Sequence, residues 1–306
     1  MIDFEEVTKL YGSVIGVNDI NLSLEPGSYG LLGPNGSGKT TLLNLITGQL
    51  KATQGRVQLF GASPILEKHV LHRIGFCPAV DLLLTNVTGF DWVTYLLELQ
   101  GYDRQGAVEK TNEAFDIVGL DEARHRSIGG YSRGMKQRCK LAQAISHDPD
   151  LLILDEPFTG VDPVGRHNLS ELFCDWVANG KSLLVASHVL HEVDLISDRV
   201  ILIANGHVIA EGDVRGMRDE MDEHPRQYVV RCRDASRLAS KLFEQDHIAQ
   251  IQVHEDRLGL LVMTRSQNDF ARALGRLAVD GHRIESVMAV DENVDALYKY
   301  LIGGGA

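Results

Sequence analysis

The first fifty residues alternate between short apolar runs and turns before the pattern changes. Apolar residues cluster at 14–17, 20–24 and 29–32, which predicts three short strands because runs of this length bounded by turn-forming residues are typical of strands. Between residues 39 and 50 the leucines and isoleucines recur with helical spacing, and Gly48 marks the predicted end of this helix. A strand, a glycine-rich loop and a helix are therefore expected to follow one another.

Helices are predicted to interrupt this pattern at 86–126, where apolar residues again recur with helical spacing. Beyond residue 134 strands and helices alternate. The predicted elements are a helix at 134–147, a strand at 151–154, a helix at 164–179, a strand at 182–187, a helix at 189–196 and strands near 199–210. This alternation is typical of a mostly parallel α/β sheet. It predicts an α/β domain over residues 1–216, with a helical subdomain at about 86–134.

A second, smaller domain is predicted over residues 227–306. The stretch 217–226 is rich in charge, contains Pro225 and has little apolar pattern, so it is interpreted as a linker. The elements predicted after it are a strand at 228–232, a helix at 235–245, strands at 248–254 and 258–263, a helix at 267–279, a strand at 283–290 and a final helix at 293–301. The order βαββαβ predicts a small α+β domain with a ferredoxin-like fold.

Composition narrows the class of protein. The chain has 306 residues, of which 44% are hydrophobic and 24% charged, as in ordinary folded domains. A net charge of −12 argues against nucleic acid as the main partner, because that affinity comes from Lys and Arg neutralising phosphates. The four cysteines lack metal-ligand spacing, and no apolar run approaches the roughly 18 residues of a membrane span. We therefore expect any membrane association to depend on a partner.

A complete phosphate-binding motif follows the strand that ends at Leu32. Residues 33–40 match the pattern GxxxxGK[ST] of the P-loop, in which glycines let backbone N–H groups approach phosphates at a helix N-terminus. Lys39 is predicted to reach the β- and γ-phosphates, and Thr40 to ligate Mg²⁺. The predicted nucleotide-binding residues here are Gly33, Pro34, Asn35, Gly36, Ser37, Gly38, Lys39, Thr40 and Thr41.

Two acidic residues end the apolar run at 151–154. A buried strand with this pattern delivers Asp155 and Glu156 to the carboxyl edge of the sheet, where ligands of open α/β sheets bind. Asp155 then resembles the Walker B aspartate of P-loop NTPases, which supports Mg²⁺, and Glu156 is placed to orient or deprotonate the attacking water. Acidic residues often follow strands, so this motif gains its meaning from the P-loop.

The segment Tyr131-Ser132-Arg133-Gly134-Met135 resembles the signature of ABC ATPases, whose commoner form is Leu-Ser-Gly-Gly-Gln. Ser132 and Gly134 occupy the matching positions, while Arg133 and Met135 differ. The resemblance implies that Ser132, Gly134 and the helix N-terminus meet the γ-phosphate bound by the opposite copy of the chain. A simpler role for Ser132 as a helix N-cap is compatible with this one.

Three further residues match the same family, and one does not. Asp162, within 159–163, resembles the D-loop aspartate; His188 resembles the switch histidine that contacts the γ-phosphate; and Tyr11 resembles the aromatic residue that stacks on adenine. The family's glutamine that senses Mg²⁺ and the attacking water is replaced by Ala79. The resemblance therefore leaves the coupling to a membrane partner less defined than the ATP site.

The resemblance covers about residues 1–215 and implies a P-loop NTPase fold of the ABC type, with a mixed sheet and a helical insertion. It implies an ATPase that uses ATP and Mg²⁺ and dimerises when ATP is bound, either with itself or with a related ATPase. A separate transmembrane permease would hold it on the cytoplasmic face of the cell membrane. The transported substrate is not predicted. Export is favoured over import by the signature variant and the C-terminal domain.

Two other functions agree less well with the sequence. A soluble ABC ATPase acting on nucleic acid or ribosomes is opposed by the single cassette, the lack of heptads and the acidic charge. A regulatory module with inactive catalysis gains some support from Ala79. It is opposed by the intact set of Lys39, Asp155, Glu156 and His188.

Overall fold

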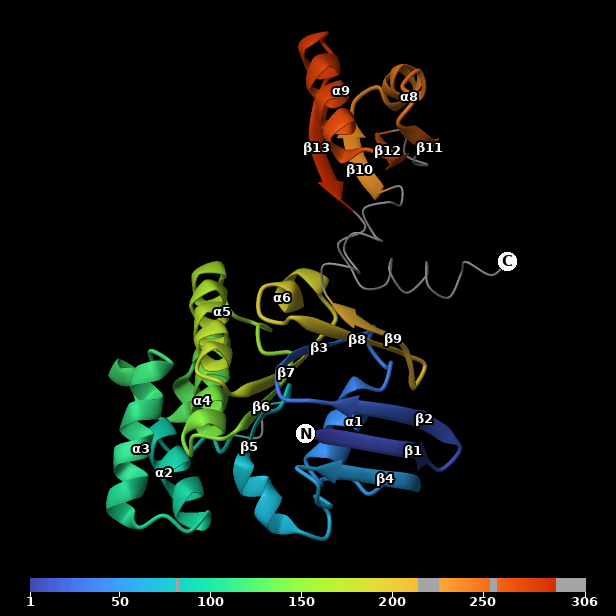
Figure 1. Ribbon diagram of the computed structural model, residues 1–306. Helices are drawn as coiled ribbons and strands as arrows, with labels where there is room; N and C mark the ends of the chain where they lie inside the picture. The colour runs from blue at the N-terminus through green and yellow to red at the C-terminus, as the bar shows by residue number, and fades with distance from the viewer. Residues whose placement is uncertain (81–82, 214–225, 254–257, 290–306) are drawn as a thin grey trace. The chain divides into compact units, whose positions relative to one another are not determined.

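The computed structural model describes residues 1–80, 83–213, 226–253 and 258–289 (Figure 1). The chain divides into two compact units, Met1–Gly212 and Asp213–Ala306. The boundary predicted at 216/217, almost all of the predicted linker at 217–226 and the predicted final helix at 293–301 lie outside the described residues.

The first unit contains two sheets. A three-stranded antiparallel sheet has the order β2-β1-β4, formed by β1 (Ile2–Tyr11), β2 (Val14–Leu24) and β4 (Gln54–Leu59). A six-stranded sheet has the order β5-β6-β7-β3-β8-β9, formed by β3 (Ser28–Leu32), β5 (Ile74–Cys77), β6 (Leu151–Asp155), β7 (Ser182–Ser187), β8 (Arg199–Ala204) and β9 (His207–Asp213). Strands β5, β6, β7, β3 and β8 pair in parallel. The predicted mixed-sheet α/β fold is confirmed.

The helices of this unit connect the strands. They are α1 (Lys39–Ile46), α2 (Gly89–Leu99), α3 (Arg104–Ile117), α4 (Arg133–Ile145), α5 (Pro163–Ala178) and α6 (Leu190–Asp194), with short 3₁₀ turns η1 (Lys68–Arg73), η2 (Asp121–Ala123) and η3 (Ile128–Gly130). Helix α1 ends at Ile46, shortly before its predicted end at Gly48, where the chain turns with a φ of +67°. None of the helices within the described residues has the length and apolarity needed to cross a bilayer.

The central strands β3, β6 and β7 of the six-stranded sheet are buried on both faces, which explains their continuous apolar runs. In β6, Leu152 and Leu154 belong to one core cluster, shared with α2, α3, α4 and α5. Leu151 and Ile153 belong to the other cluster, shared with α1 and the antiparallel sheet. Figure 1 shows the same arrangement, with α2–α5 on one side of the sheet and β1, β2 and β4 on the other. Strand β6 is thus packed between the two core clusters along its length up to Asp155.

The two strands predicted at 14–17 and 20–24 are in fact one strand, β2. It pairs with β1 across several register shifts. At such irregularities the strand continues through the polar residues that separate the two apolar runs. Strands β1 and β4 were not predicted individually. In β1 the alternation is interrupted where Glu6 has a φ of +52°, so the strand does not show a regular period of two.

The second unit has the element order βαββαβ, with its elements at β10 (Arg226–Cys232), α8 (Ala235–Phe243), β11 (Ile248–Val253), β12 (Gly259–Thr264), α9 (Gln267–Val279) and β13 (Ile284–Ala289). The sheet is antiparallel with the order β11-β12-β10-β13. Leu238 and Phe270 of the helices share a core with Val230 and Val262 of the strands. Element order and strand pairing are those expected for a ferredoxin-like unit.

Candidate functional site

The predicted site residues gather at the carboxyl edge of the six-stranded sheet. Strand register places Leu32 of β3 beside Ser187 of β7, and Ala186 of β7 beside Asp155 of β6. The segments that follow these strands therefore emerge side by side. This is the edge at which open α/β sheets bind their ligands.

The loop of residues 33–38 needs glycine at two positions for steric reasons. A Cβ added to Gly33 would lie 2.2 Å from the carbonyl oxygen of Ile203. One added to Gly38 would lie 2.6 Å from the carbonyl oxygen of Gly16, and Gly38 has a φ of +112°, which L side chains rarely adopt. The loop thus packs tightly between neighbouring strands and leads directly into α1.

Lys39 is the first residue of α1 and is only 6% exposed. Its Nζ donates hydrogen bonds to the carbonyl oxygens of Gly33 at 2.7 Å and Pro34 at 3.2 Å, and lies 3.9 Å from Oε1 of Glu156. The ammonium therefore lies within its own loop, facing the end of β6. The buried hydroxyl of Ser37 has no hydrogen-bond partner in the described structure, so the loop retains an unused polar group. A loop with a buried cation and a spare donor fits a nucleotide phosphate.

Thr40 and Asp155 are brought together although they lie far apart in sequence. Oγ1 of Thr40 donates to Oδ2 of Asp155 at 3.0 Å. Burial raises the pKa of Asp155, which is 2% exposed, while the Thr40 hydrogen bond and the charge of Lys39 act against that rise. Carboxylate and hydroxyl oxygens are ligands that Mg²⁺ prefers, and Mg²⁺ is usually held by one or two carboxylates plus water and phosphate. This pair therefore fits a magnesium ion.

That fit does not require a cage of protein ligands. Among the described residues there is no group of three or more His, Cys, Asp or Glu side chains that could hold a metal ion. A metal at this edge would consequently share its coordination between the protein and a phosphate-bearing ligand.

Glu156 and His188 form the third element of the site. Nδ1 of His188 lies 2.9 Å from both Oε1 and Oε2 of Glu156. Since a carboxylate can only accept, Nδ1 carries the hydrogen and donates it. Glu156 has a φ of +51°, uncommon for a residue other than glycine and frequent where a side chain must be aimed at a functional position. Its carboxylate is thereby held between Lys39 and His188.

Tyr11, at the end of β1, is 46% exposed and lies beside the start of α1. Its hydroxyl is 3.4 Å from Oγ1 of Thr41. Nζ of Lys9 lies 5.5 Å from the centre of its ring. An exposed aromatic ring next to the phosphate loop is available for stacking on a base.

Ser132, Gly134 and Asp162 lie at helix N-termini. Ser132 caps α4 by accepting a hydrogen bond from Met135 N at 3.2 Å, and Asp162 caps α5 by accepting one from Gly165 N at 2.9 Å. The latter bond lowers the pKa of Asp162. A Cβ on Gly134 would have its nearest neighbour 3.8 Å away, so this position is open. The contacts of Ser132 and Asp162 are with their own helices rather than with Lys39 or Thr40.

Ala79 follows β5, whose Cys77 pairs with Leu154 of β6, so it too lies at this edge. Lys140 of α4 donates to the carbonyl oxygens of Pro78 at 2.9 Å and Ala79 at 3.2 Å. Lys140 is 3% exposed and was not identified from the sequence. The burial of Lys140 on one face of α4 with Gln137 and Ala144 appears only in the structure, because a polar residue at 137 leaves this face without an apolar pattern in the sequence.

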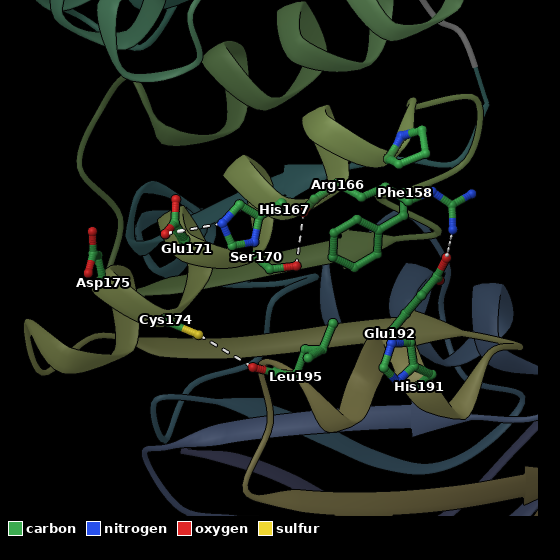
Figure 2. Close-up of a pocket in the computed structure, with 11 residues that line it drawn as sticks. Phe158, Arg166, His167, Ser170, Glu171, Cys174, Asp175, His191, Glu192 and Leu195 are labelled. Atoms are coloured by element: carbon green, nitrogen blue, oxygen red, sulfur yellow. Dashed lines mark hydrogen bonds and ion pairs between the residues drawn. The ribbon is translucent and has the colours of Figure 1, made fainter.

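A pocket of about 720 Å³ lies between α5 and α6, as Figure 2 shows. Phe158, Arg166, Cys174, Glu192 and Leu195 are among its lining residues, and none of residues 33–41 is. The nucleotide-binding residues described above therefore do not form this pocket. Arg166 and Glu192, which were also not identified from the sequence, form an ion pair in its wall.

Known proteins similar to this chain are named as ATP-binding proteins of transport systems. The family model described as "ABC transporter" matches residues 17–159. The chain is 33% identical to the bacitracin transport ATP-binding protein BcrA of Enterococcus faecalis over 312 residues, which covers 100% of this chain and 97% of the relative. It is 37% identical to the Nod factor export ATP-binding protein I of Burkholderia orbicola (strain AU 1054), covering 69% of this chain and 70% of that one.

A solved structure resembles the first unit. The dimeric structure of MJ0796, a bacterial ABC transporter cassette, aligns with a TM-score of 0.66 at 24% identity and covers 71% of this chain and 100% of that chain. This likeness concerns the fold.

Proposed function

The chain belongs to the ABC transporter family as an ATP-binding protein, and from this membership we propose that it hydrolyses ATP to power export through a separate transmembrane permease. The observation that carries the proposal is the joining of Lys39, Thr40, Asp155, Glu156 and His188 at one sheet edge. The name of one relative, a Nod factor export protein, favours export over import. The permease would hold the chain on the cytoplasmic face of the membrane.

In this proposal the chain binds ATP through the loop of residues 33–41 and Tyr11. Lys39 neutralises charge on the β- and γ-phosphates, and the ring of Tyr11 stacks on adenine. Thr40 and Asp155 would hold Mg²⁺, which when bound neutralises phosphate charge. Catalysis then consists mainly of positioning and electrostatic stabilisation.

Glu156 is proposed to align the attacking water and accept its proton. The carboxylate is already oriented from two sides, by His188 at 2.9 Å and by Lys39 at 3.9 Å. His188 donates to Glu156 through Nδ1, which leaves Nε2 to donate to a phosphate oxygen when the ring is protonated.

The site is proposed to be completed by a second protomer, either another copy or a related ATPase. Ser132 and Gly134 lie at the exposed start of α4, and the open space at Gly134 lets a phosphate approach the backbone there. Asp162 caps the helix that follows the loop beginning at Glu156. Each of two ATP molecules would thus lie between one protomer's Lys39 and the other's Ser132.

Substitution of Lys39 tests the ATP-binding role directly. Lys39→Met in the full-length chain should abolish binding of a fluorescent ATP analogue and release of phosphate, because the buried ammonium is the cation of the loop. Lys51→Met, at an exposed lysine in the first unit, is the matched control and should leave both unchanged. Hydrolysis by Lys39→Met at the wild-type rate would exclude the assigned site.

The permease requires its own test. Co-expression with a multispan membrane protein encoded beside this chain should move the chain into the membrane fraction and raise its ATPase activity. A chain that stays in the supernatant in the presence of every such neighbour would refute the transporter partnership while leaving the ATPase assignment intact.

A further inference from the structure

Two segments at the catalytic edge are joined by more than the contact between Glu156 and His188. Residues 156–162 follow β6 and end at the N-cap of α5, and residues 187–189 run from the last residue of β7 to the N-cap of α6. The backbone N–H of Glu156 donates to the carbonyl oxygen of Ala186 at 2.9 Å. The two segments therefore start side by side, but this bond does not hold their later residues together.

A second connection links the far ends of the two segments. The guanidinium of Arg166 on α5 donates through Nη1 to Oε1 of Glu192 on α6 at 2.9 Å (Figure 2). Its Nε donates to the carbonyl oxygen of Val161 at 3.1 Å. One planar side chain thus ties the end of residues 156–162 to helix α6.

Glu192 also contacts Ser187, the residue before His188. Its Oε2 accepts a hydrogen bond from Oγ of Ser187 at 2.8 Å, and Oγ of Ser187 in turn accepts from the backbone N–H of Val189 at 3.0 Å. Ser187 is fully buried and the Glu192 side chain is 12% exposed, so water competes little for these bonds. This one serine hydroxyl therefore connects Glu192 to the backbone that follows His188.

These contacts form a closed ring. From Glu156 the chain runs to Val161, then through Arg166 and Glu192 to Ser187, and the adjacent His188 returns to Glu156. Breaking the ring at the ion pair would leave the two segments joined only at their start, by the backbone bond from Glu156 to Ala186 and by the contact between Glu156 and His188. Small misplacements of catalytic groups have large effects on rate.

We propose that Arg166 and Glu192 are positioning residues for ATP hydrolysis: they hold residues 156–162 and 187–189 in register so that His188 keeps the carboxylate of Glu156 aligned. The inference rests on the ATPase function proposed above. It assigns neither residue a contact with ATP.

The first test is Glu192→Gln, which preserves the size of the side chain and removes its charge. We expect kcat to fall about tenfold, while the KM and Kd for ATP stay within about twofold, because the link positions a catalytic group and not the phosphate loop. The kcat of Arg166→Gln should fall by the same factor. The double variant should lose no more than either single variant, since both substitutions break one link.

The matched control is Asp150→Asn. Asp150 pairs with Arg73 at 2.6 Å near the opposite, amino ends of β5 and β6, with both side chains about half exposed. Its loss should leave kcat unchanged. An equal fall of kcat in Asp150→Asn and Glu192→Gln would show a general effect of losing an ion pair and overturn the proposal.

Dependence on His188 separates positioning from simple stabilisation. In a His188→Ala background, measured by single-turnover hydrolysis, Glu192→Gln should cause no further loss because the group that it positions is gone. A tenfold loss in both backgrounds overturns the proposal, as does an unchanged kcat in Glu192→Gln. If Glu192→Gln melts before the assay temperature, Ser187→Ala, which removes only the hydroxyl, is tested against the same expectations. A wild-type chain that hydrolyses no ATP would instead overturn the proposed function itself.

Discussion

Replacing Glu156 by glutamine would exchange one oxygen for an amide nitrogen and remove a negative charge from the catalytic edge. The carboxylate contacts Nδ1 of His188 at 2.9 Å through both oxygens and lies 3.9 Å from Nζ of Lys39. The amide of Glu156→Gln keeps one oxygen that can accept from His188. Lys39 also keeps its hydrogen bonds to two loop carbonyls. The fold and the ATP-binding loop should therefore survive the substitution.

The rate of ATP hydrolysis should fall sharply in Glu156→Gln. A positioned general base contributes roughly 10²- to 10⁴-fold, which corresponds to about 3–6 kcal/mol of the activation barrier at about 1.4 kcal/mol per factor of ten. ATP affinity should be equal or higher, because the substitution removes a negative charge that faces the phosphates and competes for Lys39. We therefore expect kcat to fall at least 100-fold without a rise in the Kd for ATP.

Phosphate release and equilibrium binding of a fluorescent ATP analogue measure the two effects separately. Glu171→Gln, the same change at an exposed glutamate of α5 that pairs with His167, provides the control and should behave as wild type. If Glu156→Gln hydrolyses ATP within threefold of the wild-type rate, the assigned role of Glu156 is wrong.

Blocked hydrolysis should also reveal the dimer. Because ATP that binds across two protomers stabilises their association by mass action, Glu156→Gln with MgATP should elute as a dimer at concentrations where the nucleotide-free chain is a monomer. A monomer under these conditions, also when the permease is present, would contradict the shared site.

Four further predictions concern folding and coupling. Gly30→Ala should destabilise the first unit by roughly 1–3 kcal/mol in urea unfolding, because its Cβ would lie 1.9 Å from Cγ1 of Val193. Gly134→Ala should melt at the wild-type temperature, since its Cβ has no neighbour nearer than 3.8 Å, and yet lose ATPase activity if phosphate approaches that backbone in the dimer. A chain ending at residue 216 should still bind ATP, and a folded but non-binding product would refute the independence of the first unit. Ala79→Gln should change stimulation of ATPase activity by the permease more than it changes ATP affinity, and equal stimulation would remove that expectation.

The sequence predicts a strand best where the whole strand is buried, because burial produces an unbroken apolar run. Strand β6 shows as an unbroken apolar run because both of its faces are covered, and its end fixes the place of Asp155. Strand β4 (Gln54–Leu59) was missed because it lies at the edge of the small antiparallel sheet, with Leu59 its only fully buried side chain. An edge strand with few apolar residues lacks a periodic signal.

Contacts between charged residues far apart in the chain have no such signal either. The sequence, together with its resemblance to ABC ATPases, predicted Lys39, Asp155 and His188, and the structure brings their segments together at one edge. It could not predict that Arg166 would meet Glu192, which is 26 residues away, because both positions resemble ordinary solvated helix residues. Such pairs depend on how α5 and α6 pack against the sheet.

The contact of Lys140 with residues 78–79 changes what the alanine at position 79 implies. The ammonium of Lys140 donates to the carbonyl oxygens of Pro78 and Ala79, so the backbone of this segment is held from α4 whatever side chain stands at position 79. Hydrogen bonds to charged groups contribute roughly 1.5–3 kcal/mol each, and separating the two elements would lose both. The start of α4 at Ser132 and the turn after β5 are therefore expected to shift together. Ala79→Gln thus tests coupling through a side chain while this backbone connection stays intact.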